Sequence, residues 1–337
     1  MNAPDDFELY RRLVLVRRVE EWIIAQYAAQ NAAFARKEEP DLSIRCPTHL
    51  SIGQEAAAVG VCAALRDTDV AYSTHRCHAH YLAKGGSVDR MIAELCGRAT
   101  GCSKGKGGSM HLLDVDRGMY GASAVVGGSI PLAIGAAFAS VMQGRDDVGV
   151  AFFGDGAVEQ GIFHESLNFA SLRSLPVIFV CENNFYATLS HVSGRQRVGI
   201  AQRAHAYDMP GVEVEGVDTR AVTAVAREAV ARARRGDGPT LLEVKAYRWM
   251  SHVGTEFDTG KMKRSAEELD AWRQRCPVAF MRRALAAAGV DDARLDRAED
   301  DARAAIEHGV AFARASAEPA ASDLMRDLAG EAAVWPG

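Results

Sequence analysis

Several classes of protein are excluded by what this sequence lacks. Its 39 lysines and arginines against 44 aspartates and glutamates give a net charge of −5, so no basic excess exists to neutralise a nucleic-acid backbone. Charged residues interrupt the apolar residues of positions 1–27, which argues against a signal-peptide core and favours an amphipathic surface helix. Residues 119–143 lack charge, but their glycines and Pro131 favour a buried helix that begins near Ser129 over a membrane span. We therefore expect no nucleic-acid or membrane partner.

Cysteine is also sparse and poorly arranged for cross-links. The seven cysteines are odd in number, scattered, and include no Cys-x-x-Cys pair. This pattern predicts reduced thiols and a cytoplasmic protein. What the sequence does contain, 48% hydrophobic and 25% charged residues over 337 positions, is the composition of an ordinary globular protein of one or two domains.

Apolar runs of strand length alternate with helical patterns along the middle of the chain. The predicted strands are residues 148–153, 176–181 and 240–244. The predicted helices are residues 87–96, 129–142, 162–172 and 222–234. Continuous apolar strands joined by helices predict the α/β class, with a parallel sheet covered by helices on both faces. We expect a single domain over residues 1–337, with helical extensions at about 1–40 and 266–337.

Polar residues follow two of the predicted strands. Asp155 lies in a Gly-Asp-Gly turn after the first strand, and Asn184 follows the second strand, 29 positions later. In one βαβ unit both residues emerge side by side at the carboxyl edge of the sheet, where α/β proteins bind ligands. Carboxylate and amide oxygens suit Mg²⁺ or Ca²⁺, and the flanking glycines let a diphosphate approach the backbone. For Asp155 alone, a plain helix cap is the alternative.

Two nucleotide-binding alternatives fail on single residues. A dinucleotide-binding fingerprint that begins at Gly154 needs a glycine at the position of Glu159. A Walker A loop needs Ser or Thr after Gly105 and Lys106, where the sequence has Gly107.

Longer segments around these motifs resemble one enzyme family. Gly-Asp-Gly followed at this spacing by Asn-Asn resembles the thiamine diphosphate motif. Residues 48–60, 73–85, 91–111 and 152–187 resemble the alpha subunit of the decarboxylating component of 2-oxo acid dehydrogenase complexes. Within that family, STHR at 73–76 and VGGSIPLAIGAA at 126–137 are most similar to the acetoin dehydrogenase branch, beside pyruvate dehydrogenase.

The resemblance implies thiamine diphosphate and Mg²⁺ as cofactors. It implies that Mg²⁺ is bound by the side chains of Asp155 and Asn184 and by the backbone oxygen of Tyr186. The residues implied to bind the cofactor as a whole are His75, Arg76, Val126, Asp155, Gly156, Ala157, Asn184, Tyr186 and His252. Among them, Arg76 would neutralise the diphosphate and Val126 would lie near the aminopyrimidine.

Histidines are the implied catalytic residues. His252 would act as proton donor or electrostatic stabiliser and His49 would position the substrate, both converging on the reacting carbon. A zinc cluster within residues 75–80, which hold three histidines and Cys77, is disfavoured because the spacing matches no tetrahedral site. For the remaining histidines a structural role is the simpler interpretation, namely for His164, His191, His205 and His308.

The same resemblance implies partners. Members of the family cleave the bond next to the carbonyl of a 2-oxo acid or acetoin and pass the acyl unit to the lipoyl group of an acyltransferase. In two-chain members the glutamate that activates the cofactor lies on a beta subunit, and this sequence shows no second domain able to supply it. We therefore expect an α₂β₂ heterotetramer whose isolated alpha chain is inactive.

Some positions depart from the family pattern and leave the substrate open. Cys77, Ala79 and Ala124 stand where the acetoin branch has glycine, adding bulk beside the cofactor, and the loop around His252 lacks the usual Gly and Ser. The basic run at 104–111 is either a solvated turn or, as the resemblance implies, a loop packed by the active site. Two functions remain as alternatives: a two-subunit carboligase that uses a small acceptor, and a catalytically silent assembly subunit, which the intact metal ligands disfavour.

Overall fold

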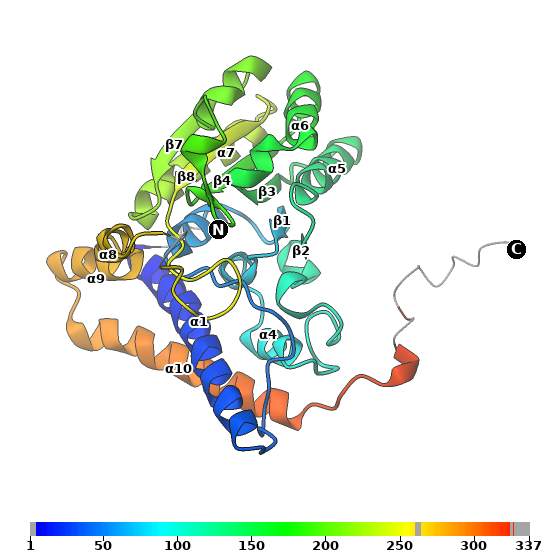
Figure 1. The fold of residues 1–337 in the computed structure, drawn as a ribbon. Helices are drawn as coiled ribbons and strands as arrows, with labels where there is room; N and C mark the ends of the chain where they lie inside the picture. The colour runs from blue at the N-terminus through cyan, green and yellow to red at the C-terminus, as the bar shows by residue number, and fades with distance from the viewer. Residues whose placement is uncertain (1–4, 260–263, 324–325, 327–337) are drawn as a thin grey trace, which may run out of the picture.

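A parallel sheet forms the centre of the fold. The computed structural model describes residues 5–259, 264–323 and 326, and its main sheet has six strands in the order β2-β1-β3-β4-β8-β7, every neighbouring pair being parallel (Figure 1). The strands are β1 (Val70–Thr74), β2 (Met119–Ser123), β3 (Gly149–Gly154), β4 (Val177–Asn183), β7 (Gly211–Glu215) and β8 (Thr240–Lys245). An antiparallel pair, β5 (Tyr186–Ala187) and β6 (Ser190–His191), follows β4. The predicted α/β class is confirmed.

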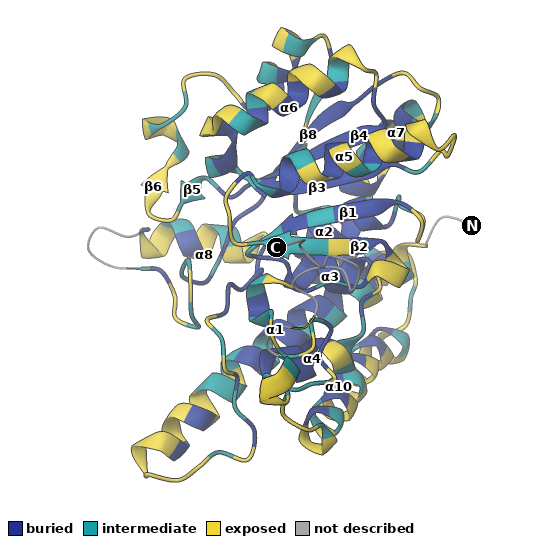
Figure 2. Cartoon of the chain, turned by 90° about the vertical axis from the view of Figure 1, so that its right-hand side faces the viewer, coloured by how far each residue is buried: buried dark blue, intermediate teal, exposed yellow. Residues whose placement is uncertain are grey.

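Helices cover both faces of this sheet, as predicted (Figures 1 and 2). The helices are α1 (Asp6–Ala35), α2 (Glu55–Cys62), α3 (His78–Ala83), α4 (Val88–Leu95), α5 (Ser129–Met142), α6 (Gly161–Leu172), α7 (Thr219–Arg234), α8 (Ala266–Gln274), α9 (Pro277–Ala287) and α10 (Asp292–Ala315). Successive side chains of β3 alternate between two cores. Val150 and Phe152 belong to the core that also contains residues of α1, α2, α4 and α7, whereas Ala151 and Phe153 belong to the core formed with α5 and α6.

The three predicted strands correspond to β3, β4 and β8, and the four predicted helices to α4, α5, α6 and α7. The sequence pattern missed β1, β2 and β7. These strands read VAYST, MYGAS and GVEVE, so small and polar residues interrupt the apolar run that marks a buried strand. β2 and β7 are the edge strands, where one side of the strand faces no neighbour and such residues are tolerated.

Helical extensions are present at both ends of the chain. α1 begins after Asp5, whose side chain accepts a hydrogen bond from the backbone N–H of Glu8 at 2.7 Å. At the other end, α10 crosses beneath α1 (Figure 1) and packs on α4. Except for residue 326, the predicted extension lies outside the described residues from 324 onward.

Two helices differ from expectation in burial. The first half of α1 is buried more deeply than in a surface helix, because Arg17 and Glu20 are buried along with its apolar residues, whereas much of its second half is exposed. α5 was expected to be buried, yet Leu132 and Met142 are exposed by 49% and 72%. Its inner side packs on the sheet while its outer side, which carries no charge, faces solvent. Across the described residues, no helix is both long and apolar enough to cross a membrane.

The fold positions polar residues at the carboxyl edge of the sheet. β3 and β4 pair so that Gly154, the last residue of β3, lies opposite Glu182. Asp155 and Asn184 therefore emerge from adjacent strands. The strand order places β1 on the other side of β3, and the loop that follows β1 brings His75 and Arg76 to the same edge.

Candidate active site

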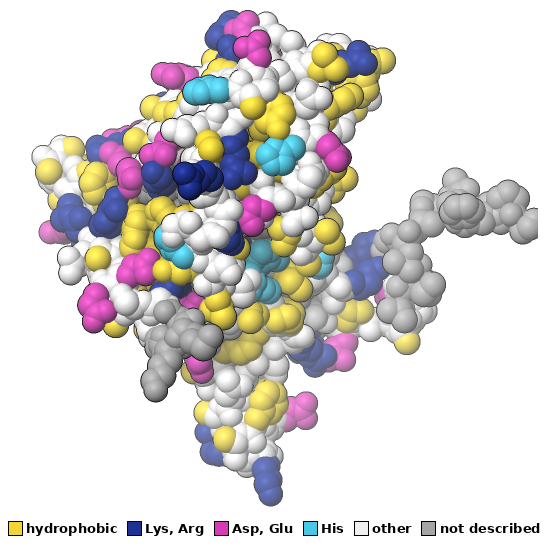
Figure 3. Space-filling model, turned by 45° about the horizontal axis from the view of Figure 1, so that its top comes forward, with side chains coloured by type: hydrophobic (Ala, Val, Ile, Leu, Met, Phe, Trp, Pro, Cys, Tyr) yellow, Lys and Arg dark blue, Asp and Glu magenta, His cyan; other side chains and the backbone are white. Residues whose placement is uncertain are grey.

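A cavity of about 170 Å³ lies at this carboxyl edge. All the residues implied to bind the cofactor line it, namely His75, Arg76, Val126, Asp155, Gly156, Ala157, Asn184, Tyr186 and His252. They come from the ends of β1, β3, β4 and β8 and from the loop before α5. Residues far apart in the sequence are thus brought to one place. In the space-filling view, several histidine side chains lie together near the middle of one face (Figure 3).

Asp155 is a buried carboxylate with a cationic partner. Arg195 forms an ion pair with Asp155 and with the more exposed Glu159, and Gln196 Nε2 donates to the backbone oxygen of Asp155 at 2.8 Å. Burial raises the pKa of Asp155, and the Arg195 guanidinium opposes that rise. The positive charge of Arg195 therefore lies against the Asp155 carboxylate, at the position where the sequence predicts Mg²⁺.

Asn184 is held by two hydrogen bonds beside Asp155. Its Oδ1 accepts from the backbone N–H of Tyr186 at 3.2 Å, and its Nδ2 donates to Gln54 Oε1 at 2.7 Å. These bonds fix the orientation of the amide, because its N and O ends have different partners. Gln54 precedes α2 and lines the same cavity.

Two features of the cavity wall fit a diphosphate–metal group. Gln54 Nε2 is buried and has no hydrogen-bond partner, which leaves one donor available to an anion. An added Cβ at Gly154 would meet nothing within 4 Å, so the backbone there is open to a bound group. Together with the carboxylate and amide oxygens of Asp155 and Asn184, this donor set suits a hard divalent cation and a phosphate.

Arg76 lies in the cavity wall and joins two loops. Its guanidinium donates to the backbone oxygens of Leu50 at 2.8 Å and of His252 at 3.2 Å. Burial lowers its pKa to about 10, and the guanidinium remains charged at pH 7. The residue therefore ties the loop containing His49 to the loop containing His252.

The three histidines predicted to lie near the cofactor form a cluster. The ring centres of His49 and His75 are 4.7 Å apart, those of His49 and His252 5.4 Å, and those of His75 and His252 5.2 Å. Burial, followed by the Arg76 charge, lowers the pKa to about 3 for His49 and His75 and to about 4 for His252. All three imidazoles are neutral at pH 7, so each ring can donate one hydrogen bond and accept another.

The other histidines of this region pair with buried carboxylates. His78 Nδ1 lies 2.7 Å from Glu20 Oε1, and His78 Nε2 lies 2.7 Å from Ser109 Oγ. This Ser-His-Glu arrangement has the geometry of a hydrolase triad, but all three residues are fully buried. Glu20 also accepts from the backbone N–H of Ser51 at 2.7 Å, so the group holds the loop that carries His49.

A buried ion cluster holds the loop around His252. Arg248 and Arg264 both lie against Asp258, at 3.5 and 3.6 Å. Arg248 also donates to the backbone oxygen of Met250 at 2.8 Å. Arg264 follows residues 260–263, which lie outside the described residues. The loop around His252 is therefore organised by buried charges.

Two sets of residues that the resemblance places near the cofactor do not line the described cavity. Cys77, Ala79 and Ala124 were expected to add bulk beside the cofactor, but none of them lines the cavity. The Cys77 and Ala79 side chains are buried in the core, because the turn of α3 directs them away. The basic loop at 104–111 does not line the cavity either.

That loop is built around a buried carboxylate. Glu94 accepts hydrogen bonds from the backbone N–H groups of Ser103, Gly105, Gly107 and Gly108, each at 2.8–2.9 Å. Such a carboxylate fixes the loop conformation by satisfying several donors at once. The link to the site is indirect and runs through Ser109 and His78.

Sequence reasoning missed three residues of the site. Gln54 lies in the same motif as His49, but nothing in the sequence indicates that Gln54 accepts a hydrogen bond from Asn184. Glu182 directly precedes Asn183 and Asn184 and pairs with His80 at 3.1 Å. Arg195 lies on a loop with no strand or helix pattern, so no sequence feature indicated its contact with Asp155.

The parallel sheet and the polar cavity at its carboxyl edge place the chain among the α/β enzymes. Residues 11–322 match the family described as dehydrogenase E1 component, and the chain belongs to this family. The resemblance seen in the sequence motifs is confirmed.

Curated relatives cover most of the chain. The alpha subunit of acetoin:2,6-dichlorophenolindophenol oxidoreductase from Bacillus subtilis is 44% identical over 281 residues, covering 83% of this chain and 84% of that protein. The subunit of the same name from Cupriavidus necator is 40% identical and covers 95% of this chain and 92% of its own. The pyruvate dehydrogenase E1 component subunit alpha of Rhizobium meliloti is 38% identical, covering 97% and 90%.

Proposed function

We propose that this chain is the alpha subunit of a two-subunit, thiamine diphosphate- and Mg²⁺-dependent E1 enzyme that cleaves a 2-oxo acid or acetoin and transfers the acyl unit to a lipoyl group. One observation carries the proposal: all the residues implied to bind the cofactor, drawn from separate loops, line one cavity at the carboxyl edge of the sheet. Membership of the dehydrogenase E1 component family supports it.

The carboxyl edge supplies the groups that would hold the cofactors. Asp155, Asn184 and the backbone oxygen of Tyr186 would bind Mg²⁺, with Arg195 giving up its place against Asp155. The free Nε2 of Gln54 would donate to the diphosphate, and Val126 would lie beside the aminopyrimidine. When bound, thiamine diphosphate supplies an electron sink for cleavage of the bond next to a carbonyl.

The histidine cluster would serve the reacting atoms. A neutral imidazole donates one hydrogen bond and accepts another, which allows His252 to hold a proton at the substrate oxygen and His49 to orient the substrate. Arg76 and Arg248 keep the field in this region positive, which favours negative charge developing on a substrate oxygen.

A second chain would complete the site. At about 170 Å³ the cavity is smaller than the range of roughly 300–1,000 Å³ usual for ligand sites, as expected for half of a shared site. Val126 at its rim is exposed by 52%, and the outer side of α5 continues this apolar surface. There Phe138 contacts Phe169 of α6 at 6.0 Å between ring centres. Exposed apolar surface of this kind marks a subunit contact.

The occupant we assign to that surface is the beta subunit, which would form an α₂β₂ heterotetramer with this chain. The surface is continuous with the cavity, because it begins at Val126 and Gly127, which line the cavity that the second chain would close. Gly135 exposes its backbone on the outer side of α5, with nothing within 4 Å of an added Cβ, so another helix can approach closely. The cytoplasm remains the expected compartment.

Reconstitution tests the function. The chain and its complementary beta chain are purified separately and mixed with thiamine diphosphate, Mg²⁺ and either pyruvate or acetoin, and turnover is followed with a dye as electron acceptor. We expect turnover only when both chains are present. Turnover by this chain without its partner would overturn the proposal, as would an inactive mixture that has assembled.

The acceptor and the interface are tested in the same system. Acylation of an isolated lipoyl domain, read by mass spectrometry, supports the dehydrogenase function, whereas product release only with a free aldehyde acceptor supports the carboligase alternative. Met142→Glu on the outer side of α5 should prevent assembly, measured as mass in solution. Phe34→Glu is the matched control, because Phe34 is also exposed but belongs to the last turn of α1, which lies away from α5 (Figure 1), and it should assemble normally.

A further inference from the structure

The histidine cluster formed by His49, His75 and His252 brings three ring nitrogens close enough together to hold a metal ion. The three residues come from the segment before α2, from the loop after β1 and from the loop after β8. Each offers one ring nitrogen that lies within 4.8 Å of the others. Ring contacts join all three pairs, so the rings surround one point.

The spacing of the rings is that of a tetrahedral metal site. Zinc holds imidazole nitrogens at about 2.0–2.1 Å, which places the centres of three coordinating rings about 5 Å from one another. The centres here are 4.7, 5.2 and 5.4 Å apart. Coordinating nitrogens in such a site are about 3.3 Å apart, so rotation of the rings about their existing positions suffices to bring the nitrogens in.

The ring nitrogens are also available. His49 is buried, and its Nδ1 has no hydrogen-bond partner. No described residue is hydrogen-bonded to a ring nitrogen of His75 or His252 in the part of the chain that the structure covers. Neutral imidazole is the form that ligates metals, and these rings are neutral at pH 7.

Two charges act against a cation at this point. The guanidinium groups of Arg76 and Arg248 lie close enough to lower the pKa of His252. Their positive charges also repel a divalent ion. Magnesium, which prefers oxygen ligands, gains too little from imidazole to overcome this repulsion. Ions that bind imidazole strongly, of the Zn²⁺ and Co²⁺ class, gain more from the three nitrogens.

We propose that His49, His75 and His252 form a binding site for a divalent transition-metal ion of the zinc class, separate from the Mg²⁺ ligands Asp155 and Asn184. The ion takes three imidazole nitrogens and leaves its fourth position to water. Occupancy ties up the lone pairs of the histidines that face the substrate, so the ion inhibits the enzyme reversibly. The inhibition rests on the proposed function; the binding itself does not.

Cobalt spectroscopy tests the binding on the full chain without its partner, freed of metal and carrying no affinity tag. Addition of Co²⁺ should produce the visible absorption bands of tetrahedral cobalt, and Zn²⁺ should abolish them. In calorimetry with Zn²⁺, His75→Tyr should weaken binding at least tenfold, because one of three ligands is lost. His205→Tyr is the matched control, since His205 is exposed and distant in sequence, and should stay within twofold.

The outcomes separate the proposals. Octahedral cobalt bands, or Zn²⁺ affinity unchanged in both His75→Tyr and His252→Ala, would overturn the metal site whatever the enzyme does. Circular dichroism and thermal unfolding of each variant show that it is folded. If the reconstituted enzyme is active and is inhibited by Zn²⁺ equally in the chain with His205→Tyr and in the chain with His75→Tyr, the inhibitory role fails while the proposed function stands.

Discussion

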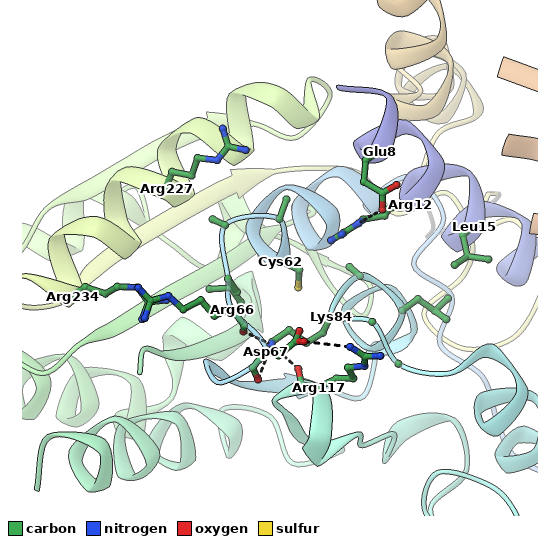
Figure 4. A pocket seen from close by; sticks show the side chains of 17 residues that line it. Glu8, Arg12, Leu15, Cys62, Arg66, Asp67, Lys84, Arg117, Arg227 and Arg234 are labelled. Atoms are coloured by element: carbon green, nitrogen blue, oxygen red, sulfur yellow. Dashed lines mark hydrogen bonds and ion pairs between the residues drawn. The ribbon is translucent and has the colours of Figure 1, made fainter. Parts of the chain in front are cut away.

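The two edges of the parallel sheet carry cavities of opposite character. The larger cavity, about 860 Å³, lies at the amino edge between α1, the ends of α2 and α3, and α7 (Figure 4). Its charged side chains largely bind the protein itself: Arg12 pairs with Glu8 at 2.9 Å and Arg117 with Asp67 at 3.3 Å. The cavity at the carboxyl edge is about a fifth of that size.

The difference lies in whether polar groups are satisfied. At the amino edge, Lys84 donates to the backbone oxygens of Arg66 at 2.7 Å and Arg117 at 2.6 Å, so its charge stabilises the turns before the strands. At the carboxyl edge, Gln54 and His49 each leave a buried nitrogen without a partner. Unpaired buried groups cost free energy that only a ligand recovers. Among the described residues that line the two cavities, only Gln54, at the carboxyl edge, has a buried side-chain nitrogen without a partner, so an unsatisfied donor rather than volume distinguishes the candidate site.

The largest expected effect is at Asp155. Asp155→Ala removes the carboxylate that would bind Mg²⁺, and we expect at least a thousandfold weaker binding of thiamine diphosphate, about 4 kcal/mol. Calorimetry in the presence of the beta chain and Mg²⁺ measures it. Asp67→Ala at the amino edge is the control and should leave the affinity within twofold. Equal losses in the two variants would remove the distinction between the edges.

The next effect is on stability and belongs to the amino edge. Lys84→Met keeps the length of the buried side chain but leaves carbonyl oxygens without their donor. We expect the free energy of unfolding to fall by about 2–3 kcal/mol, measured by urea denaturation. The affinity for thiamine diphosphate should not change. A variant of normal stability with impaired cofactor binding would show that the amino edge is functional.

The contrast between the edges also explains how far the sequence could predict the fold. β3 and β4 are buried on both faces, so their side chains form continuous apolar runs that any reading of the pattern finds. β2 and β7 lie at the edges of the sheet and include exposed residues, and their sequences carry no such run. The exposed side of α5 was missed for another reason: an uncharged helix looks the same in sequence whether the protein's own core or a second chain covers it.

For the candidate site, the positions of residues could be predicted where a motif directly follows a strand of the sheet. Asp155 and Asn184 follow strands of one βαβ unit, and topology alone places them together. Arg195 could not be predicted, because an ion pair between a loop and a strand end depends on the path of that loop. The Glu20–His78 pair joins α1 to α3 across 58 positions, and nothing in either segment indicates the other.

Substitution of Gln54 should have a smaller effect on cofactor affinity, and it tests the role of the unsatisfied donor. Gln54→Leu removes both the bond to Asn184 and the free Nε2, and we expect thiamine diphosphate to bind about tenfold more weakly, about 1.4 kcal/mol. Gln54→Glu keeps the acceptor for Asn184 but places a carboxylate where the free donor was. If that donor faces the diphosphate, Gln54→Glu should bind more weakly than Gln54→Leu. The reverse order in calorimetry would assign the effect to the Asn184 bond alone.

The smallest effect is the pH dependence of stability that His49 confers. Its pKa is about 3 in the folded chain against an ordinary value near 6.5 once unfolded. As pH falls below 6.5 the unfolded chain takes up a proton that the folded chain refuses, so stability is complete above this pH and is lost progressively toward pH 3.

At pH 5 the loss should be about 1 kcal/mol after allowance for solvent at the cavity mouth. His49→Gln cannot be protonated, so the stability of this variant should fall less between pH 7 and pH 5. Urea denaturation at the two pH values measures the difference. Identical pH slopes in the two proteins would mean that His49 takes up its proton equally in both states. Burial at the carboxyl edge would then not be the reason why the imidazole of His49 stays neutral.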